Sequence, residues 1–315
     1  MVKEDKDNKK KLSKGKKIVI YSVGVILLIV ITIVSFAYWY VNNMLSNVGK
    51  LDISVNSEAI GINPELEESF GEVRNIALLG IDSRDGDVGR SDSIMILTLD
   101  GIHKKLKLTS IMRDSYVDIA GYGLDKVNHA YAFGRAELSI KTLNENFDLN
   151  IKEVMTVNFD SLTSIIDKIG GVNINIIEEE ISHISGVTST GDQLLNGKQA
   201  LAYARIRYAS GGDYKRTERQ RTVVDAIFNK LKNTNITEYP SVINEFLPFV
   251  ETNMSSNDMI GLAKDFSTLI SKGLEQDRFP RDEQGVGQMI DGVYYLTFDR
   301  EIVKNSLHNY IFEDK

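Results

Sequence analysis

The sequence contains no cysteine, four prolines, four histidines and one tryptophan among its 315 residues. Without cysteine the chain can have no disulfide framework, no thiol nucleophile and no zinc site built on thiolates. The few prolines and a hydrophobic content of 42% indicate a folded chain with a substantial core rather than a disordered one. The histidines show no metal-binding spacing such as HExxH, so we interpret all four as ordinary surface or core residues: His103, His129, His183 and His308.

The N-terminal forty residues differ in character from the rest of the chain. Residues 1–17 carry eight lysines against three acidic residues, which gives this tail a net charge of +5. An uncharged stretch of 23 residues follows, from Ile18 to Tyr40, and it ends in several aromatic side chains. At about 1.5 Å per residue, such a helix is long enough to span a bilayer core of about 30 Å. The lysines are expected to remain in the cytoplasm.

A cleaved signal peptide is the alternative, but its apolar region would be about 7–15 residues long and would end in small residues. We therefore predict a single-pass protein of the cell membrane, with a cytoplasmic tail (1–17), a transmembrane helix (18–41) and everything else extracellular. Subtracting the +5 of the tail from the total of −7 leaves −12 for residues 18–315. An acidic domain on the outside is not expected to bind nucleic acid, which requires a basic surface.

Residues 42–72 are polar and predict an extracellular stalk, followed by a globular domain over 73–315. Strands are predicted from apolar or alternating runs over 74–82, 93–100, 106–113, 154–159, 172–176 and 293–297. Helices are predicted over 129–147, 161–170, 197–204, 216–233 and about 239–271, and at the C-terminus. Strands interleaved with helices indicate an α/β (α+β) domain, in which a central mixed β-sheet has helices on both faces.

Arginine is concentrated in one place: five of the thirteen arginines lie within residues 205–221. The guanidinium is a permanently charged, planar fork of donors that matches phosphate. Arg205 and Arg207 are two residues apart, so an extended backbone would point both side chains to one side. Ordinary solvated arginines paired with nearby acids are the alternative, but two clusters flanking a glycine turn favour an anion site.

The second arginine cluster is predicted to lie on a helix. Arg216, Arg219 and Gln220 are three and four residues apart and so share one helix face, in the first turn of the predicted helix. The free N–H groups of a helix N-terminus also suit phosphate.

Carboxylates and a further arginine lie at or near the ends of neighbouring predicted strands. Asp82 closes the first strand, Asp92 precedes the second and Arg113 closes the third, while Arg90 lies in the loop between the first two. Two carboxylates suit one Mg²⁺, which takes one or two of them and leaves its other positions to phosphate and water. Ordinary turn chemistry explains the same Asp, Gly and Ser residues equally well.

Several segments together resemble the LytR–CpsA–Psr family: NIALLGIDSRDGDVGRSDSIMILTLD, TSIMRDSYVDI, DKVNHAYAFG, DKIGGVNI and LNGKQALAYARIRYASGGDYKRTERQR. They occur in order over about residues 73–235. The resemblance implies that Asp82 and Asp92 are carboxylates of a Mg²⁺ site, with Mn²⁺ as an alternative metal. It implies catalytic roles for Asp82, Asp92, Arg113 and Arg207, and a pyrophosphate-binding set of Arg90, Arg113, Arg205, Arg207, Arg216, Arg219 and Gln220.

The resemblance also implies the reaction. Enzymes of this family transfer a glycopolymer, such as wall teichoic acid or capsular polysaccharide, from a polyprenyl-pyrophosphate carrier to peptidoglycan in Gram-positive cell walls. The product is a phosphodiester. Asp82 or Asp92 would accept the proton of the acceptor hydroxyl, and Asp213 is an alternative base. The lipid would occupy an apolar tunnel, and the apolar residues of helices 129–147 and 216–233 either line it or form plain core.

Three other functions are alternative interpretations of the same residues. A membrane-anchored binding module would need the arginines but not the paired carboxylates, and a pyrophosphate hydrolase would replace the wall hydroxyl with water. A transcriptional regulator would need the arginine helix in the cytoplasm, which contradicts the predicted topology.

Overall fold

The computed structural model describes residues 32, 35, 38–54, 56–83, 87–207, 212–233 and 244–315. The chain divides into two compact units, Met1–Ser46 and Asn47–Lys315. The predicted basic tail and most of the predicted span over 18–41 lie outside the described residues. Among the residues that are described, no helix has the length and apolar character needed to cross a membrane.

A seven-stranded mixed sheet forms the centre of the second unit, in the order β1-β10-β7-β2-β3-β4-β11. The β2–β3, β3–β4 and β7–β10 pairs are antiparallel, whereas β2–β7, β4–β11 and β1–β10 are parallel. The strands are β1 (Gly49–Lys50), β2 (Val73–Asp82), β3 (Arg90–Asp100), β4 (Lys105–Ile111), β7 (Glu153–Asn158), β10 (Glu251–Thr252) and β11 (Leu274–Phe279). The prediction of a central mixed sheet is confirmed.

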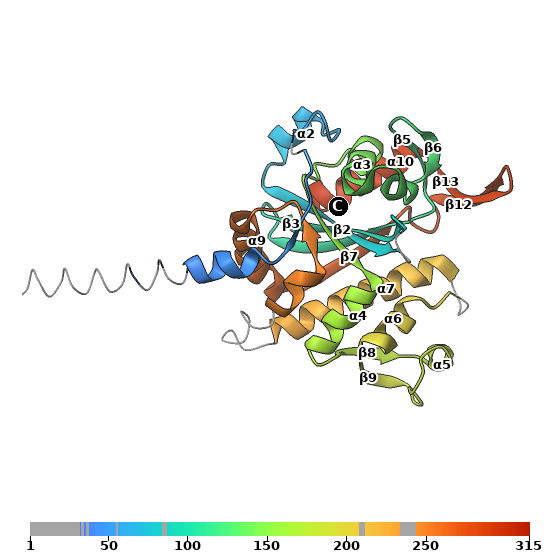
Figure 1. The fold of residues 1–315 in the computed structure, drawn as a ribbon. Helices are drawn as coiled ribbons and strands as arrows, with labels where there is room; N and C mark the ends of the chain where they lie inside the picture. Colours follow the sequence, from blue (N-terminus) through green and yellow to red (C-terminus); the bar gives the residue numbers. More distant parts are fainter. Residues whose placement is uncertain are drawn as a thin grey trace, which may run out of the picture. The chain divides into compact units, whose positions relative to one another are not determined.

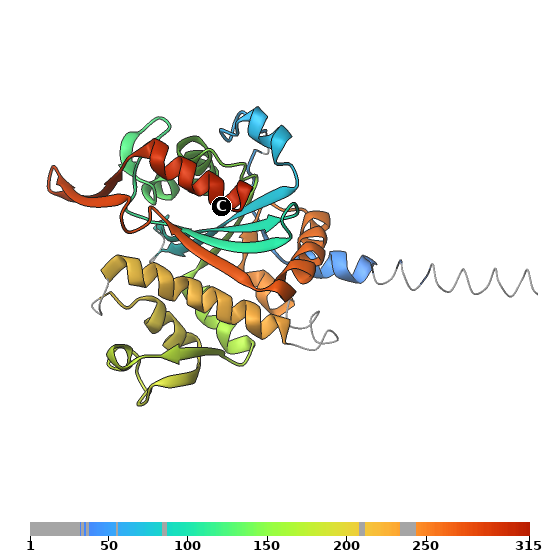
Figure 2. The same cartoon turned by 180° about the vertical axis from the view of Figure 1, so that it is seen from behind.

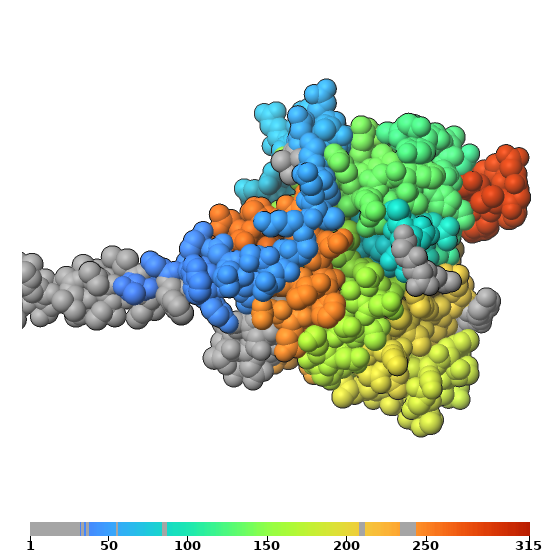
Figure 3. Space-filling model, viewed as in Figure 1, coloured from blue at the N-terminus to red at the C-terminus, as the bar shows by residue number. Residues whose placement is uncertain are grey.

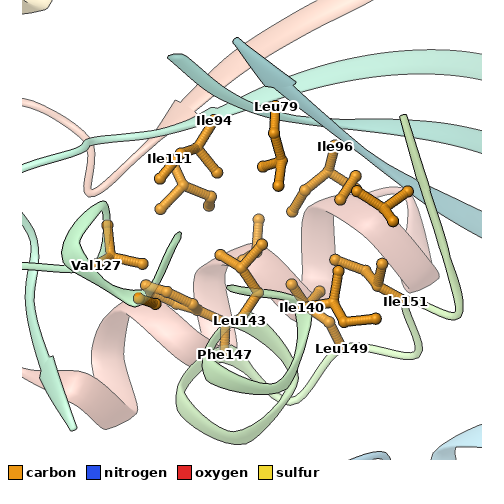
Figure 4. Packing of buried hydrophobic residues seen from close by; sticks show 14 of the residues in the cluster. Leu79, Ile94, Ile96, Ile111, Val127, Ile140, Leu143, Phe147, Leu149 and Ile151 are labelled. Atoms are coloured by element: carbon orange, nitrogen blue, oxygen red, sulfur yellow. The ribbon is translucent and has the colours of Figure 1, made fainter. Parts of the chain in front are cut away.

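Helices cover both faces of this sheet, as predicted (Figures 1 and 2). On one face, α3 (His129–Phe147) and α10 (Arg300–His308) bury the largest core cluster. Figure 4 shows side chains of the sheet, including Ile94 and Ile96, directed toward Leu143 and Phe147 of α3. The opposite face packs against α7 (Gly212–Lys232) and α9 (Ser256–Leu269). Successive strand residues point to opposite faces, so Met95 and Leu97 belong to this second cluster.

A third cluster forms a smaller layer beneath α7. It is built from α4 (Phe159–Lys168), β8 (Val172–Ile176), α5 (Glu178–Ile181), β9 (Gly191–Leu195) and α6 (Gly197–Ala204). The helix α7 is shared between two clusters. Its Val223 and Ala226 are buried in the third cluster, while Val224 and Phe228 pack against the second. Because these residues lie on different sides of the helix, α7 has apolar partners on both sides.

The remaining described elements are short and lie around this core. They are α2 (Pro64–Ser69), the hairpins β5 (Tyr116–Ile119) with β6 (Gly123–Lys126) and β12 (Gly285–Ile290) with β13 (Val293–Phe298), the 3-10 turns Leu247–Phe249 and Ile270–Lys272, and a C-terminal π-helical turn Asn309–Glu313.

Four sequence-based predictions need correction. The folded unit begins at Asn47 rather than at 73, because Ile60, Ile62 and Leu66 of the predicted stalk are buried in the first core cluster. The helix predicted over 239–271 is interrupted: residues 244–246 are helical and continue into the 3-10 turn Leu247–Phe249, β10 follows, and a separate helix begins at Ser256, where the Ser255 side chain caps it. The helix predicted over 216–233 begins at Gly212, so Arg216 lies one turn further in. The extended form predicted at Arg205 is instead the C-terminal cap of α6, with φ −95° and ψ −2°.

Candidate functional site

The polar side chains predicted at the strand ends come together at one edge of the sheet. Asp82 is the last residue of β2 and pairs in register with Arg90 at the start of β3. Because β3 is antiparallel to both β2 and β4, its beginning lies beside the ends of those two strands. Asp92 lies near that beginning, and Arg113 follows β4 by two residues. The pattern of apolar strands with polar ends therefore predicted this edge correctly.

Asp92 is the most firmly held of these groups. It is 8% exposed, and its Oδ2 accepts a hydrogen bond from Arg113 Nη1 at 2.8 Å. Its Oδ1 accepts from Asn128 Nδ2 at 2.9 Å. The Arg113 Nε also lies 3.4 Å from Asp114 Oδ2, and Asp114 in turn pairs with Lys126 at 2.7 Å. Both oxygens of Asp92 therefore serve to orient neighbouring side chains, and Asn128 is a site residue that the sequence did not single out.

Arg216 is buried beside this pair, on α7. The residue is only 2% exposed, and its Nη2 donates to Asp213 Oδ2 at 3.0 Å. Its Nη1 lies 2.8 Å from Asp213 Oδ1, but without hydrogen-bond geometry. Within the described part of the chain, the buried Nε has no hydrogen-bond partner at all. Buried donors of this kind are rare because leaving them unpaired is costly, so the guanidinium is well suited to accept an anion.

The charges around Arg216 also affect its titration. Burial lowers the pKa of Arg216, and together with the nearby positive charges of Arg113 and Arg207 it brings this pKa to about 10, against the opposing effect of Asp213. Folding therefore disfavours the charged form of this side chain. A phosphate group between these three arginines would relieve their mutual repulsion.

Arg205 and Arg207 lie at the open side of the site. Both are exposed, in agreement with a role in contacting a ligand from solvent. The Arg205 Nη2 lies 3.3 Å from Asp82 Oδ1, and its guanidinium packs over the Phe159 ring at 4.7 Å from the centroid. Arg207 lies close enough to Arg216 to influence its pKa. The arginines 205, 207 and 216 thus converge with Asp82 and Arg113, as the sequence predicted.

Arg219 has a different environment. Its Nε donates to Glu180 Oε1 at 2.7 Å, and its Nη2 lies 3.6 Å from Glu179 Oε1, so it joins α7 to α5 in the smaller layer. Gln220 is buried on α7. The buried Arg221 donates from Nη1 to Ser110 Oγ of β4 at 2.9 Å, a contact that the sequence did not predict. The contacts of Arg219 and Arg221 are those of residues that hold α7 in place.

An open pocket of about 510 Å³ adjoins the carboxylate side of the site. Asp82, Asp87 and Arg90 line it from the sheet edge, and His129 and Phe133 line it from α3. The His129 Nδ1 lies 2.8 Å from Asp125 Oδ2, which fixes the orientation of the imidazole. Arg90 therefore stands with Asp82 on the pocket side, whereas the arginines of α7 do not line this pocket.

Asp82 and Asp92 are the candidate carboxylate ligands for Mg²⁺. No cluster of three or more acidic or histidine side chains suited to a metal occurs among the described residues. Mg²⁺ needs only one or two carboxylates when phosphate oxygens and water fill its other positions. Asp82 is partly exposed and faces the pocket, while Asp92 is buried and already accepts two hydrogen bonds. The donor set thus fits a metal brought in with a phosphate ligand, with Asp82 as its accessible carboxylate.

Comparison with known proteins identifies the family to which the chain belongs. The sequence profile of the LytR_cpsA_psr family matches residues 40–310, and the chain belongs to this family. A relative from Enterococcus faecalis, named polyisoprenyl-teichoic acid–peptidoglycan teichoic acid transferase TagU, is 33% identical over 92% of this chain and 95% of its own length. A TagU from Bacillus licheniformis is 31% identical, covering 92% of this chain and 93% of that protein. The expectation of a transferase is thus confirmed by the names of its relatives.

Two solved structures of similar fold are named as complexes with a ligand. A structure of TagT bound to LI-WTA has a TM-score of 0.64 and 30% identity, covering 76% of this chain and 91% of that one. A second structure is the LytR-CPS2A-psr family protein YwtF (TagT) with bound octaprenyl pyrophosphate lipid. It has a TM-score of 0.60 and 28% identity, and covers 77% of this chain and 91% of that one.

Proposed function

We propose that this protein is a Mg²⁺-dependent phosphotransferase that moves an anionic glycopolymer, such as wall teichoic acid or a capsular polysaccharide, from a polyprenyl-pyrophosphate carrier to a hydroxyl of peptidoglycan. The observation that carries this proposal is the buried Arg216, with unpaired donors, beside the Arg113–Asp92 pair. The TagU names of the relatives and the octaprenyl pyrophosphate bound by a protein of the same fold support the substrate class.

The reaction joins the acceptor oxygen to the phosphorus that carries the glycopolymer and breaks the bridging P–O bond, so that polyprenyl phosphate leaves. Arg113, Arg207 and Arg216 hold the pyrophosphate and stabilise the charge that develops on the leaving phosphate. Arg205, packed on Phe159 and near Asp82, binds from the open side. A bound Mg²⁺ or Mn²⁺ would neutralise phosphate charge next to Asp82 and Asp92.

The acceptor hydroxyl must also lose its proton. Asp92 already accepts hydrogen bonds from Arg113 and Asn128, and Asp213 is paired with Arg216. Asp82 lines the open pocket, where an acceptor can reach it. We therefore assign the proton acceptor to Asp82 in preference to the other two carboxylates.

We place the polyprenyl chain between the sheet and the pair α7 and α9. Several apolar side chains of this layer are only partly buried, and we expect these to line the lipid: Val224, Phe228, Leu262 and Phe266. The polyprenyl chain of a bound donor would then extend from the arginines along α7.

In vitro transfer from a defined lipid-linked donor to peptidoglycan oligomers tests the function directly. We expect polymer-linked oligomer and polyprenyl phosphate to form together, to stop on addition of a chelator and to resume with Mg²⁺. Asp82→Asn should lose transfer even at high Mg²⁺, because it removes both the accessible metal ligand and the proton acceptor, whereas the exposed Asp265→Asn on α9 should transfer normally. Release of polyprenyl phosphate without labelled oligomer would instead identify a hydrolase, and donor binding without any release would identify a binding module.

We also propose that the protein is anchored in the cell membrane with its N-terminus in the cytoplasm and residues 42–315 outside. The chain has no cysteine, so a single introduced cysteine reports its own location. A membrane-impermeant thiol reagent should label Ser185→Cys in intact cells but leave Ser13→Cys unlabelled. The reverse pattern would contradict the topology and would make a cytoplasmic regulator possible again.

A further inference from the structure

Two aromatic side chains form an exposed stack at the edge of the open pocket. The rings of Tyr122 and Phe133 lie 4.3 Å apart between centroids and within 9° of parallel. Tyr122 is nevertheless 56% exposed and Phe133 is 39% exposed. Large apolar groups left in contact with water next to a polar pocket are typical of a binding surface rather than of a core.

The local backbone is shaped to hold this stack. Tyr122 is the tip of the β5–β6 hairpin, between Gly121 at φ +83° and Gly123 at φ +78°, and its N–H donates to Ile119 O at 2.8 Å. A side chain at either glycine would be strained there. The hairpin is thus a tight turn that presents one tyrosine.

Phe133 is held by an unusual break in α3. Directly after it, Gly134 (φ −144°, ψ 23°) and Arg135 (φ 54°, ψ −149°) leave the helical conformation, so the first turn of α3 is separated from the rest. Non-glycine residues in such conformations concentrate at functional sites, where the surrounding structure enforces them. The first turn carries both His129 and Phe133, which meet edge to face at 6.0 Å.

The aromatic stack adjoins the open pocket that Asp82 lines. Phe133 and His129 line this pocket together with Asp82, Asp87 and Arg90. Its charged lining therefore has two carboxylates against one guanidinium. Such a lining suits a neutral sugar, whose hydroxyls donate to carboxylates and accept from arginine.

The pocket and the phosphate-binding arginines lie on different sides of Asp82. The pocket is formed by the sheet edge and α3, whereas Arg207 and Arg216 belong to the α6–α7 side. In Figure 3 the cyan atoms from the end of β2 and the start of β3 lie between the green surface of α3 and the yellow surface of α6 and α7. A donor held by the arginines therefore leaves the aromatic side to the second substrate.

We propose that Tyr122 and Phe133 form a platform on which a pyranose ring of the peptidoglycan acceptor strand stacks, with its hydroxyls directed to Asp82 and Asp87. The apolar C–H face of a pyranose complements the negative face of an aromatic ring. This inference rests on the proposed transferase function and adds the acceptor-binding residues to it. It also gives the pocket a role that the pyrophosphate-binding arginines do not explain.

The test separates aromatic stacking from general hydrophobicity. Tyr122→Leu and Phe133→Leu keep an apolar side chain but remove the ring, whereas Tyr122→Phe and Phe133→Tyr keep the ring. Leu194→Ala removes an equally exposed apolar side chain in β9, away from the pocket, and serves as the matched control. The full-length protein in detergent is titrated with a soluble peptidoglycan tetrasaccharide, and transfer kinetics are measured with acceptor and donor varied separately.

We expect the two leucine variants to weaken tetrasaccharide binding and to raise KM for the acceptor about three- to tenfold, with donor KM unchanged. The aromatic variants and Leu194→Ala should match the unmodified protein. Equal acceptor affinity in all variants would overturn the platform, and so would a rise in donor KM alone, which would assign the rings to the donor sugar. If no variant transfers polymer but tetrasaccharide binding follows this pattern, the proposed function fails and the sugar-binding platform stands.

Discussion

The carboxylate of Asp213 lies between two arginines that come from different elements. Its Oδ1 is 2.8 Å from Arg216 Nη1 and 3.7 Å from Arg113 Nη2. Arg113 follows β4 and Arg216 belongs to α7, so Asp213 occupies the position in which an anionic ligand would bridge sheet and helix.

Arg113→Ala and Arg207→Ala should each lower the rate of polymer transfer by about 10²–10³-fold, the usual effect of removing a donor that stabilises developing charge. Arg207 is exposed, so its removal should leave the thermal midpoint unchanged. The exposed Arg300→Ala on α10 is the control and should transfer normally. Full transfer activity in either site variant would remove that arginine from the proposed mechanism.

Arg216→Met should abolish transfer without loss of stability. The pKa of Arg216 is lowered on folding, so its charge is disfavoured in the folded state at every pH below about 10 and removing it relieves this cost. The remaining Asp213 side chain is 29% exposed and can be hydrated. Urea denaturation should give a midpoint equal to or above that of the unmodified protein. A clearly lower midpoint would show that the arginine is a structural residue.

Arg219→Met should have the opposite effect on stability. It would leave the Glu180 side chain, which is 5% exposed, buried without its cation. Breaking a buried pair in this way costs about 3–5 kcal/mol. The urea midpoint should therefore fall, and the double variant Arg219→Met/Glu180→Gln should recover most of the loss. If Arg219→Met instead kept full stability and lost donor binding, Arg219 would rejoin the pyrophosphate-binding set.

Asp225→Asn should stabilise the domain near neutral pH. Burial raises the pKa of the Asp225 carboxyl, with a smaller opposing effect from the side chain of Asn229. A carboxyl whose pKa rises on folding costs stability above its folded pKa, and this cost fades as the pH falls toward the unfolded value. The variant's advantage in urea midpoint should thus be present at pH 7 and shrink at lower pH. An advantage independent of pH would contradict this cause.

The sequence predicted the strand-end residues well because each of them lies at or next to the end of an apolar run, which the sequence shows directly. Asp82, Asp92 and Arg113 needed only that pattern. Partners that lie far apart in the chain were missed, such as Glu180 for Arg219 and Ser110 for Arg221, since no local pattern specifies them.

Local geometry also overrode one prediction. An extended backbone was predicted at Arg205 and Arg207, but Arg205 ends a helix that Asn196 and Gln199 begin with a reciprocal cap. The β5–β6 turn with Tyr122 was missed for a different reason. Its strands are four residues each, too short to show a clear alternation.

The packing of α7 on both of its sides has a consequence for how the donor is recognised. Because α7 packs against apolar layers on both of its sides, we expect Arg216 to keep its position when the donor binds. The phosphate-binding site is therefore preorganised before the donor binds. The energy of binding is not spent on ordering the helix and remains available for the transfer step.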